Sequence, residues 1–134
     1  MLTVVAALIE YEGKLLVCQR RRGDSFELKW EFPGGKLRSG ETAAEGLARE
    51  LREELGVAAH VGREVLRTRH RYRELDDEIE VIFLQATVDQ ATVQNLAFEQ
   101  MNWATPSELP ALDFLPADRE LIQKLASGAL RQTS

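Results

Sequence analysis

The sequence has little that would place the protein in a membrane, in an oxidising compartment or on nucleic acid. No apolar run approaches the roughly 20 residues that a membrane-spanning helix requires, and the apolar start of the chain lacks the basic segment of a signal peptide. The single cysteine, Cys18, cannot form a disulfide within the chain, and its apolar neighbours favour a buried thiol. Acidic residues outnumber basic ones by 22 to 17, which argues against non-specific binding to nucleic acid. We therefore expect a cytoplasmic protein that contacts neither membranes nor nucleic acid polymers.

What the sequence does contain is typical of one globular domain. Its 134 residues are 44% hydrophobic and 29% charged, so we expect a single domain over residues 1–134. Apolar patterning predicts strands at residues 2–11, 14–20, 60–73, 78–88 and 99–105, and helices at 42–55 and 117–130. Residues 31–41 contain Pro33 and three glycines and are expected to form a loop. This order indicates an α/β or α+β fold, with a mixed sheet covered by helices.

The helix predicted over residues 42–55 is the best-defined element. Thr42 and Glu45 have the spacing of a capping box, in which each side chain accepts a hydrogen bond from the backbone N–H of the other residue. Apolar side chains at helical spacing form one stripe, and Gly56 stands where a C-terminal glycine cap is expected. These signals predict both ends of the helix.

Three glutamates crowd along one border of this stripe. On a helical wheel with Leu47 at zero, Glu54 lies at about −20°, Glu50 at about −60° and Glu53 at about −120°. A solvated charged face is the simpler interpretation, but grouped like charges destabilise a helix. Gly46, one turn before Glu50, would leave room beside the acidic band for another group. A hard divalent cation would remove the repulsion, because Mg²⁺ and Mn²⁺ prefer oxygen ligands, so the residues favour a metal site.

The same segment carries a family signature. The Nudix hydrolase motif reads G-x5-E-x7-R-E-U-x-E-E-x-G-U, where U is a bulky aliphatic residue. The sequence matches it without exception, at Gly35, Glu41, Arg49, Glu50, Leu51, Glu53, Glu54, Gly56 and Val57. With the preceding "EFPGG" and the chain length, it resembles the MutT-like branch of that family. The resemblance implies an α/β/α sandwich around a mixed sheet, and hydrolysis of a nucleoside diphosphate linked to another moiety with Mg²⁺ or Mn²⁺.

The resemblance also implies a set of metal ligands. They are the backbone carbonyl of Gly35 and the carboxylates of Glu50, Glu53, Glu54 and Glu99. Glu99 belongs to a later strand, and for it the alternative is an exposed acid at a strand edge.

For catalysis, the resemblance assigns the proton-accepting role to one of the motif glutamates. Glu53 is the expected general base, with Glu50 and Glu54 as alternatives. Arg49 lies one turn before Glu53 and is expected to orient it, while Glu41 pairs with Arg49. The alternative for Arg49 is a surface ion pair of little energetic weight.

Three residues are candidates for binding the nucleotide. Arg20 resembles the position that contacts phosphate in MutT-like enzymes. Phe32 either stacks on the base or belongs to the core. Asp118 either reads the base or caps the closing helix. An ionised carboxylate only accepts hydrogen bonds, so Asp118 would favour a base edge that presents N–H donors.

We therefore expect an enzyme that converts a nucleoside triphosphate to the monophosphate and pyrophosphate, of the 8-oxo-dGTP diphosphatase type that cleans the nucleotide pool. The alternative is a pyrophosphohydrolase for CTP or a modified dCTP. Tyr72 lies roughly where dinucleoside polyphosphate hydrolases carry a tyrosine, which gives a minor alternative, and a non-catalytic nucleotide sensor is another. ADP-ribose hydrolysis is disfavoured. Nudix hydrolases that act on ADP-ribose usually carry a proline about fifteen residues beyond the motif, and no proline lies between Pro33 and Pro106. The sequence leaves both a monomer and a homodimer open.

Overall fold

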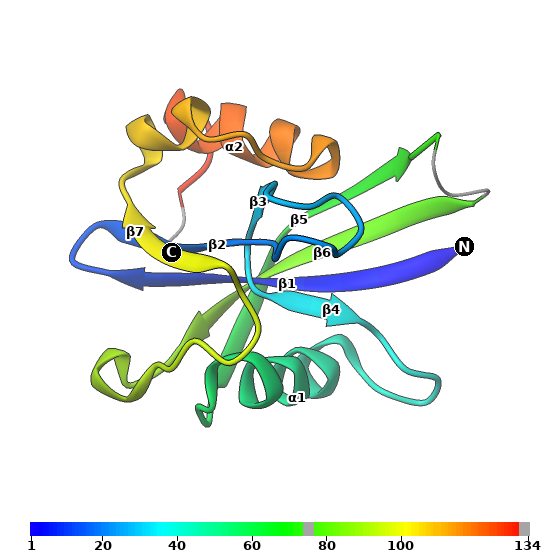
Figure 1. The fold of residues 1–134 in the computed structure, drawn as a ribbon, viewed down its shortest axis with the longest axis horizontal. Helices are drawn as coiled ribbons and strands as arrows, with labels where there is room; N and C mark the ends of the chain where they lie inside the picture. The colour runs from blue at the N-terminus through cyan, green and yellow to red at the C-terminus, as the bar shows by residue number, and fades with distance from the viewer. Residues whose placement is uncertain (74–76, 132–134) are drawn as a thin grey trace.

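In the computed structural model a mixed sheet lies between two helices (Figure 1). The structure describes residues 1–73 and 77–131, and within them the sheet has seven strands. The strands are β1 Leu2–Tyr11, β2 Lys14–Gln19, β3 Trp30–Glu31, β4 Gly34–Lys36, β5 His60–Arg71, β6 Glu78–Thr87 and β7 Gln100–Ala104. The helices are α1 Ala43–Leu55 and α2 Arg119–Ala126, and short 3-10 turns span Gln90–Thr92, Pro106–Ala111 and Pro116–Asp118. The predicted α/β class with a mixed sheet is confirmed.

Strand β1 organises the sheet. It runs parallel to β6 along most of its length, and its first half pairs antiparallel with β4, with Val5 opposite Gly35. Its last residues form a hairpin with β2, which in turn pairs with β3 and β7. The resulting strand order is β3-β2-β1-β6-β5. Because β4 leads directly to α1, this pairing holds the start of the glycine-rich segment beside the acidic helix.

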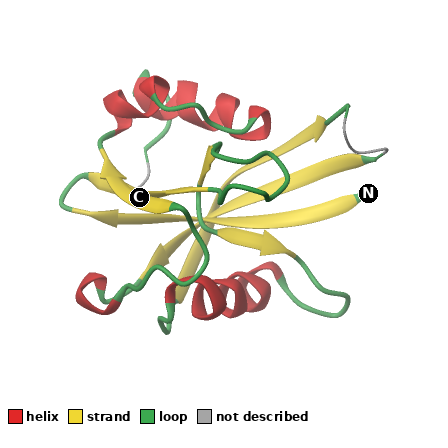
Figure 2. Ribbon diagram, viewed as in Figure 1, coloured by secondary structure: helices red, strands yellow, loops and turns green. Residues whose placement is uncertain are grey.

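The sheet separates two hydrophobic cores, one under each helix (Figure 2). Side chains alternate along β1, so Ala6 and Leu8 enter one core while Val5, Ala7 and Ile9 enter the other. Helix α2 closes the first core with Leu121, Ile122 and Leu125, and α1 closes the second with Leu47, Leu51 and Leu55. The thiol of Cys18 is buried in the second core, as predicted.

The prediction of a loop over residues 31–41 is wrong for its first half. Glu31 ends β3, and Gly34–Lys36 forms β4. A Cβ atom on Gly34 would overlap the carbonyl oxygen of Val5. The glycine is therefore required by the close approach of two strands. In the sequence, such a glycine looks the same as one that ends a regular element and begins a loop.

The other predicted strands and α1 agree with the structure to within two residues at each end. Helix α2 is shorter than predicted. Residues 116–118 form a 3-10 turn, and the helix stops before Gly128, whose φ of +80° is left-handed. In the described part of the chain, no helix is long and apolar enough to cross a membrane.

Candidate active site

Helix α1 has the caps that the sequence predicts. The Thr42 hydroxyl accepts from the Glu45 N–H at 3.1 Å, and the Glu45 carboxylate accepts from the Thr42 N–H at 2.9 Å. Gly56 adopts a left-handed conformation and donates its N–H to the carbonyl of Arg52. The caps set the two ends of α1, and the buried stripe of Leu47, Leu51 and Leu55 sets the face that meets the sheet.

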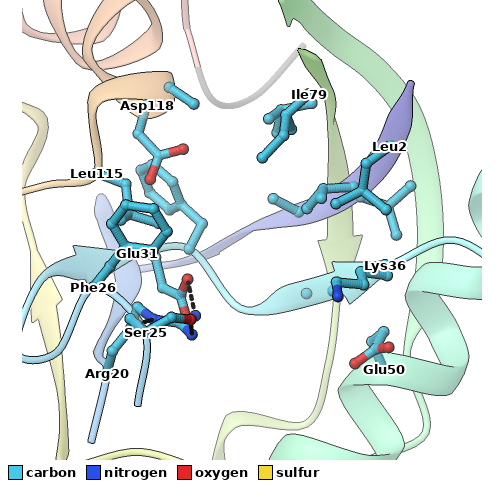
Figure 3. Close-up of a pocket in the computed structure, with 18 of the residues that line it drawn as sticks. Leu2, Arg20, Ser25, Phe26, Glu31, Lys36, Glu50, Ile79, Leu115 and Asp118 are labelled. Atoms are coloured by element: carbon cyan, nitrogen blue, oxygen red, sulfur yellow. Dashed lines mark hydrogen bonds and ion pairs between the residues drawn. The ribbon is translucent and has the colours of Figure 1, made fainter. Parts of the chain in front are cut away.

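A cavity of about 420 Å³ opens between this face of α1, strands β1 and β4, and the turn before α2. Six of the nine predicted site residues line it, namely Arg20, Phe32, Gly35, Glu50, Glu54 and Asp118. Glu50 lies across the cavity from Asp118, and Glu31 and Arg20 lie on the same side of the view as Asp118, below it (Figure 3). Arg49, Glu53 and Glu99 do not line it. Glu50 and Glu54 of α1 and the predicted base-reading residue Asp118 therefore line the same cavity.

Glu54 lies on the α1 side of the cavity, where burial, and next the charge of Glu31, raise its pKa to about 8. Its carboxylate accepts the N–H of Gly34 at 3.0 Å and forms no ion pair within the described residues. One turn earlier in α1, a carboxylate oxygen of Glu50 would lie 2.5 Å from a Cβ atom on Gly35. The glycine is therefore needed for the Glu50 carboxylate to lie against the backbone of β4.

The space beside Gly46 is filled, contrary to the sequence interpretation. A Cβ atom there would overlap the side chain of Leu37 and lie 3.1 Å from a carboxylate oxygen of Glu41. Gly46 thus lets the segment before α1 pack closely against the helix, and it leaves no room for a ligand.

Arg49 links the carboxylates on the outer side of the helix. Its guanidinium donates to both oxygens of Glu41, at 2.7 and 2.9 Å, and to Glu50 at 2.8 Å. It also lies 3.6 Å from Glu53. The hydrogen bonds from Arg49 lower the pKa of Glu41 to about 2, and those carboxylates raise the pKa of Arg49. The pairing of Arg49 with Glu41 expected from the resemblance is present.

Glu53 and Glu99 point elsewhere in this conformation. The Glu53 side chain is 51% exposed, against 15% for Glu50, and it lies 3.7 Å from Arg38. The Glu99 carboxylate accepts the backbone N–H of Arg22 at 3.3 Å. Among the described residues, no three His, Cys, Asp or Glu side chains are close enough together to hold a metal ion. The complete ligand set therefore stays a prediction.

The donors that do face the cavity suit a hard cation. The carboxylates of Glu50 and Glu54 and the backbone of Gly35 offer oxygen ligands, which Mg²⁺ and Mn²⁺ prefer. The buried Glu54 is the strongest indication, because its carboxyl group is removed from water and forms no ion pair with any residue that the structure describes.

Sequence reasoning missed Glu31. Its carboxylate lies 3.1 Å from the guanidinium of Arg20, which also donates to the carbonyl of Ser25 at 2.7 Å. Burial raises the pKa of Glu31 although Arg20 opposes that shift. A signal was present in the sequence, because a charge flanked by Trp30 and Phe32 in one short apolar segment is seldom free in solvent.

Aromatic side chains form part of the cavity wall. Phe32 is buried against Phe83 and Phe114, at centroid distances of 6.1 and 5.4 Å, so it serves the core as well as the cavity. Phe26, which sequence reasoning also missed, packs 4.9 Å from the ring of Tyr72. The Tyr72 hydroxyl accepts the N–H of Ala117 at 3.1 Å and so holds the turn that carries Asp118.

Asp118 occupies the N-cap position of α2, but its side chain makes no capping hydrogen bond. The carboxyl group instead points into the cavity (Figure 3). Asp118 is only 5% exposed, and within the described residues its Oδ2 atom has no hydrogen-bond partner. Burial, and then the charge of Glu31, raise the pKa of Asp118 well above its ordinary value.

Comparison with known proteins identifies the family. The NUDIX domain matches residues 1–125. The chain belongs to the Nudix family. It is 37% identical over 124 residues to the CTP pyrophosphohydrolase of Escherichia coli strain K12, covering 92% of this chain and 90% of that protein. It is 43% identical over 60 residues to the 8-oxo-dGTP diphosphatase of Haemophilus influenzae, which covers 44% of each.

Solved structures agree with this assignment. The solution structure of the E. coli ORF135 protein has a TM-score of 0.80 and 33% identity, covering 96% of this chain and 89% of that one. The predicted family and enzyme class are thus confirmed. The protein is a Nudix hydrolase that acts on nucleotides, and such hydrolases depend on a divalent metal ion.

Proposed function

We propose that this Nudix hydrolase converts nucleoside triphosphates to the monophosphate and pyrophosphate, with Mg²⁺ as its metal and Mn²⁺ as a substitute. The observation that carries the proposal is the cavity, which joins the acidic edge of α1 to a pocket with aromatic walls and a buried carboxyl group. A nucleotide matches these two ends, because it has an anionic polyphosphate at one end, which a bound metal would neutralise, and a flat base at the other. The cavity volume of about 420 Å³ suits such a ligand, since small-molecule sites typically span about 300–1,000 Å³.

The chemistry divides among residues of α1 and β4 and Glu99, which directly precedes β7. Glu50, Glu54 and the carbonyl of Gly35 would hold the metal, with Glu53 and Glu99 as further ligands. When bound, the metal neutralises phosphate charge and lowers the pKa of a coordinated water.

Proton transfer is assigned to Glu53. Its carboxylate accepts the proton of the attacking water, and Arg49, 3.6 Å away, orients it. Glu41 in turn fixes Arg49 through two hydrogen bonds. The water oxygen bonds to one of the two phosphorus atoms that flank the α–β bridging oxygen, the bond from that phosphorus to the bridging oxygen breaks, and the bridging oxygen keeps the electron pair, which gives the monophosphate and pyrophosphate.

Two substrate classes are candidates. The first is an oxidised purine such as 8-oxo-dGTP, which we expect from the MutT-like resemblance. The second is CTP or a modified dCTP, and the similarity to a CTP pyrophosphohydrolase along 92% of the chain supports it. Hydrolysis of dinucleoside polyphosphates has less support, because the Tyr72 hydroxyl is buried and already bonded to the backbone of Ala117. The intact motif disfavours a nucleotide sensor.

The test is a substrate panel. Purified protein with Mg²⁺ is assayed for release of pyrophosphate and of nucleotide products from 8-oxo-dGTP, dGTP, dCTP, CTP and 5-methyl-dCTP, and for release of nucleotide products from ADP-ribose and diadenosine tetraphosphate. Glu53→Gln serves as the blank. We expect release from a triphosphate at least tenfold above the blank. Nucleotide binding without turnover would support the sensor instead.

Gel filtration of the same sample tests whether residues 1–134, which we take as one domain, form a monomer or a homodimer.

A further inference from the structure

Glu53 faces away from the place where the proposed function needs it. Its side chain is 51% exposed and does not line the cavity, whereas Glu50 and Glu54 of the same helix do. Each of its two carboxylate oxygens lies near a guanidinium group instead. Oε2 is 3.6 Å from Nη1 of Arg49, and Oε1 is 3.7 Å from Nη2 of Arg38. In this conformation two arginines therefore hold Glu53.

The backbone of Arg38 is fixed from both sides. Arg38 lies in the segment between β4 and α1 (Figure 1), and its N–H donates to a carboxylate oxygen of Glu41 at 2.8 Å. The preceding residue, Leu37, donates its N–H to the carbonyl of Thr3 at 2.9 Å, and its side chain packs against Gly46 of α1. The exposed side chain of Arg38 is thus the part that can change its partner.

Arg49 and Arg38 differ in how they hold Glu53. The Nη1 atom of Arg49 that lies near Glu53 also donates to Glu50 at 2.8 Å, and Glu50 lines the cavity. Glu53 can therefore turn toward Glu50 and keep its contact with Arg49. Arg38 does not line the cavity, so the same movement takes Glu53 away from Arg38. The contact with Arg38 is the one that opposes the movement.

We propose that Arg38 is a positioning residue that holds Glu53 on the outer side of α1 and competes with the metal ion for its carboxylate. The proposal rests on the proposed function, in which Glu53 is a ligand of the metal. It goes beyond the Nudix motif, because the motif leaves open the five residues between Gly35 and Glu41, and Arg38 is one of them. The competition is thus a property of this chain's own sequence.

The effect of Arg38 on metal affinity should be small but measurable. An ion pair between side chains that are 65% and 51% exposed shifts an equilibrium by about 1.5- to 5-fold, because solvent screens the charges. We expect Arg38→Gln to lower the dissociation constant for Mn²⁺ by that factor, since no guanidinium has to be displaced from Glu53. Arg38→Lys keeps the positive charge and should bind Mn²⁺ nearly as the wild type does.

Electron paramagnetic resonance of free Mn²⁺ measures this binding on the metal-free full chain, without nucleotide or turnover. The matched control is Arg52→Gln. It removes a positive charge from an exposed residue of α1 that forms no ion pair within the described residues. Its dissociation constant for Mn²⁺ should equal that of the wild type, and thermal melting shows whether each variant is folded.

A double-mutant cycle decides whether Glu53 carries the effect. In a Glu53→Gln background, Arg38→Gln should leave the Mn²⁺ affinity unchanged, because the competing contact is already absent. The proposal is overturned if Arg38→Gln has no effect in the wild type or has the same effect in the Glu53→Gln background. It is also overturned if Arg52→Gln has as large an effect, since the cause would then be charge at a distance.

The cycle also separates the role of Arg38 from the proposed function. If no triphosphate is cleaved but positions 38 and 53 are coupled in Mn²⁺ binding, the proposed function fails and the competition stands. If triphosphates are cleaved and the two positions are not coupled, the proposed function stands and the competition is refuted.

Discussion

Replacing Glu54 by glutamine should stabilise the metal-free protein, and the gain should grow with pH. Glu54 is buried at the edge of α1, and among the described residues its carboxylate accepts one hydrogen bond, from the N–H of Gly34. Burial, with Glu31 as the next cause, raises its pKa to about 8 from an ordinary value of 4.5. The folded state therefore holds a proton that the unfolded chain releases.

The sign and size of the stabilisation by Glu54→Gln follow from the linkage between proton binding and folding. Between pH 4.5 and 8 the folded state binds more protons than the unfolded state, so the free energy of unfolding falls as pH rises. The two pKa values differ by about 3.5, and each pH unit contributes about 1.36 kcal/mol. The penalty is absent below pH 4.5 and reaches about 5 kcal/mol at most above pH 8.

Urea denaturation of metal-free wild type and Glu54→Gln from pH 5 to 9 measures this difference, with exposed Glu120→Gln as the matched control. We expect the advantage of Glu54→Gln to rise steadily across the range while Glu120→Gln stays near zero. Adding Mg²⁺ at about 100 times its dissociation constant should stabilise the wild type by about 2.7 kcal/mol and the variant by less. A difference that does not change with pH would refute the buried, uncompensated carboxylate.

Three further variants test other parts of the account. Glu41→Gln weakens the hold on Arg49, so kcat should fall about tenfold, as for other outer partners of a site, with little change in KM; an unchanged kcat would remove Glu41 from the positioning scheme. Gly35→Ala places a methyl group on the Glu50 carboxylate, so the Mg²⁺ concentration for half-maximal activity should rise, and an unaltered metal titration would contradict that contact. Leu51→Ala empties a fully buried site in α1 and should cost about 2–5 kcal/mol in urea denaturation, with activity per folded molecule preserved; a cost below 1 kcal/mol would contradict the packing of α1.

The sequence predicted α1 well because its signals are local. The capping box of Thr42 and Glu45, the apolar stripe and Gly56 all lie within one short segment. The helical wheel also placed Glu53 farthest from the stripe, and Glu53 is indeed much more exposed than Glu50. Contacts along one helix need no knowledge of the rest of the fold.

What could not be predicted depends on segments far apart in the chain. In the sequence, Gly34 looks like a loop glycine, and only the position of β1 shows that it permits strand pairing. Glu31 acquires its role from Arg20 across two strands. The pKa of Asp118 is raised by its burial and by Glu31, which is 87 positions away in the sequence, and neither cause can be seen in the segment around Asp118.

The most direct test of the central claim is to identify the products of triphosphate hydrolysis by anion-exchange chromatography. Incubation with Mg²⁺ and either 8-oxo-dGTP or CTP should yield the monophosphate and pyrophosphate in equal amounts. Chelation of the metal, or Glu53→Gln, should abolish both products. Release of a nucleoside diphosphate and inorganic phosphate would contradict cleavage between the α- and β-phosphates, and so would turnover that persists without metal.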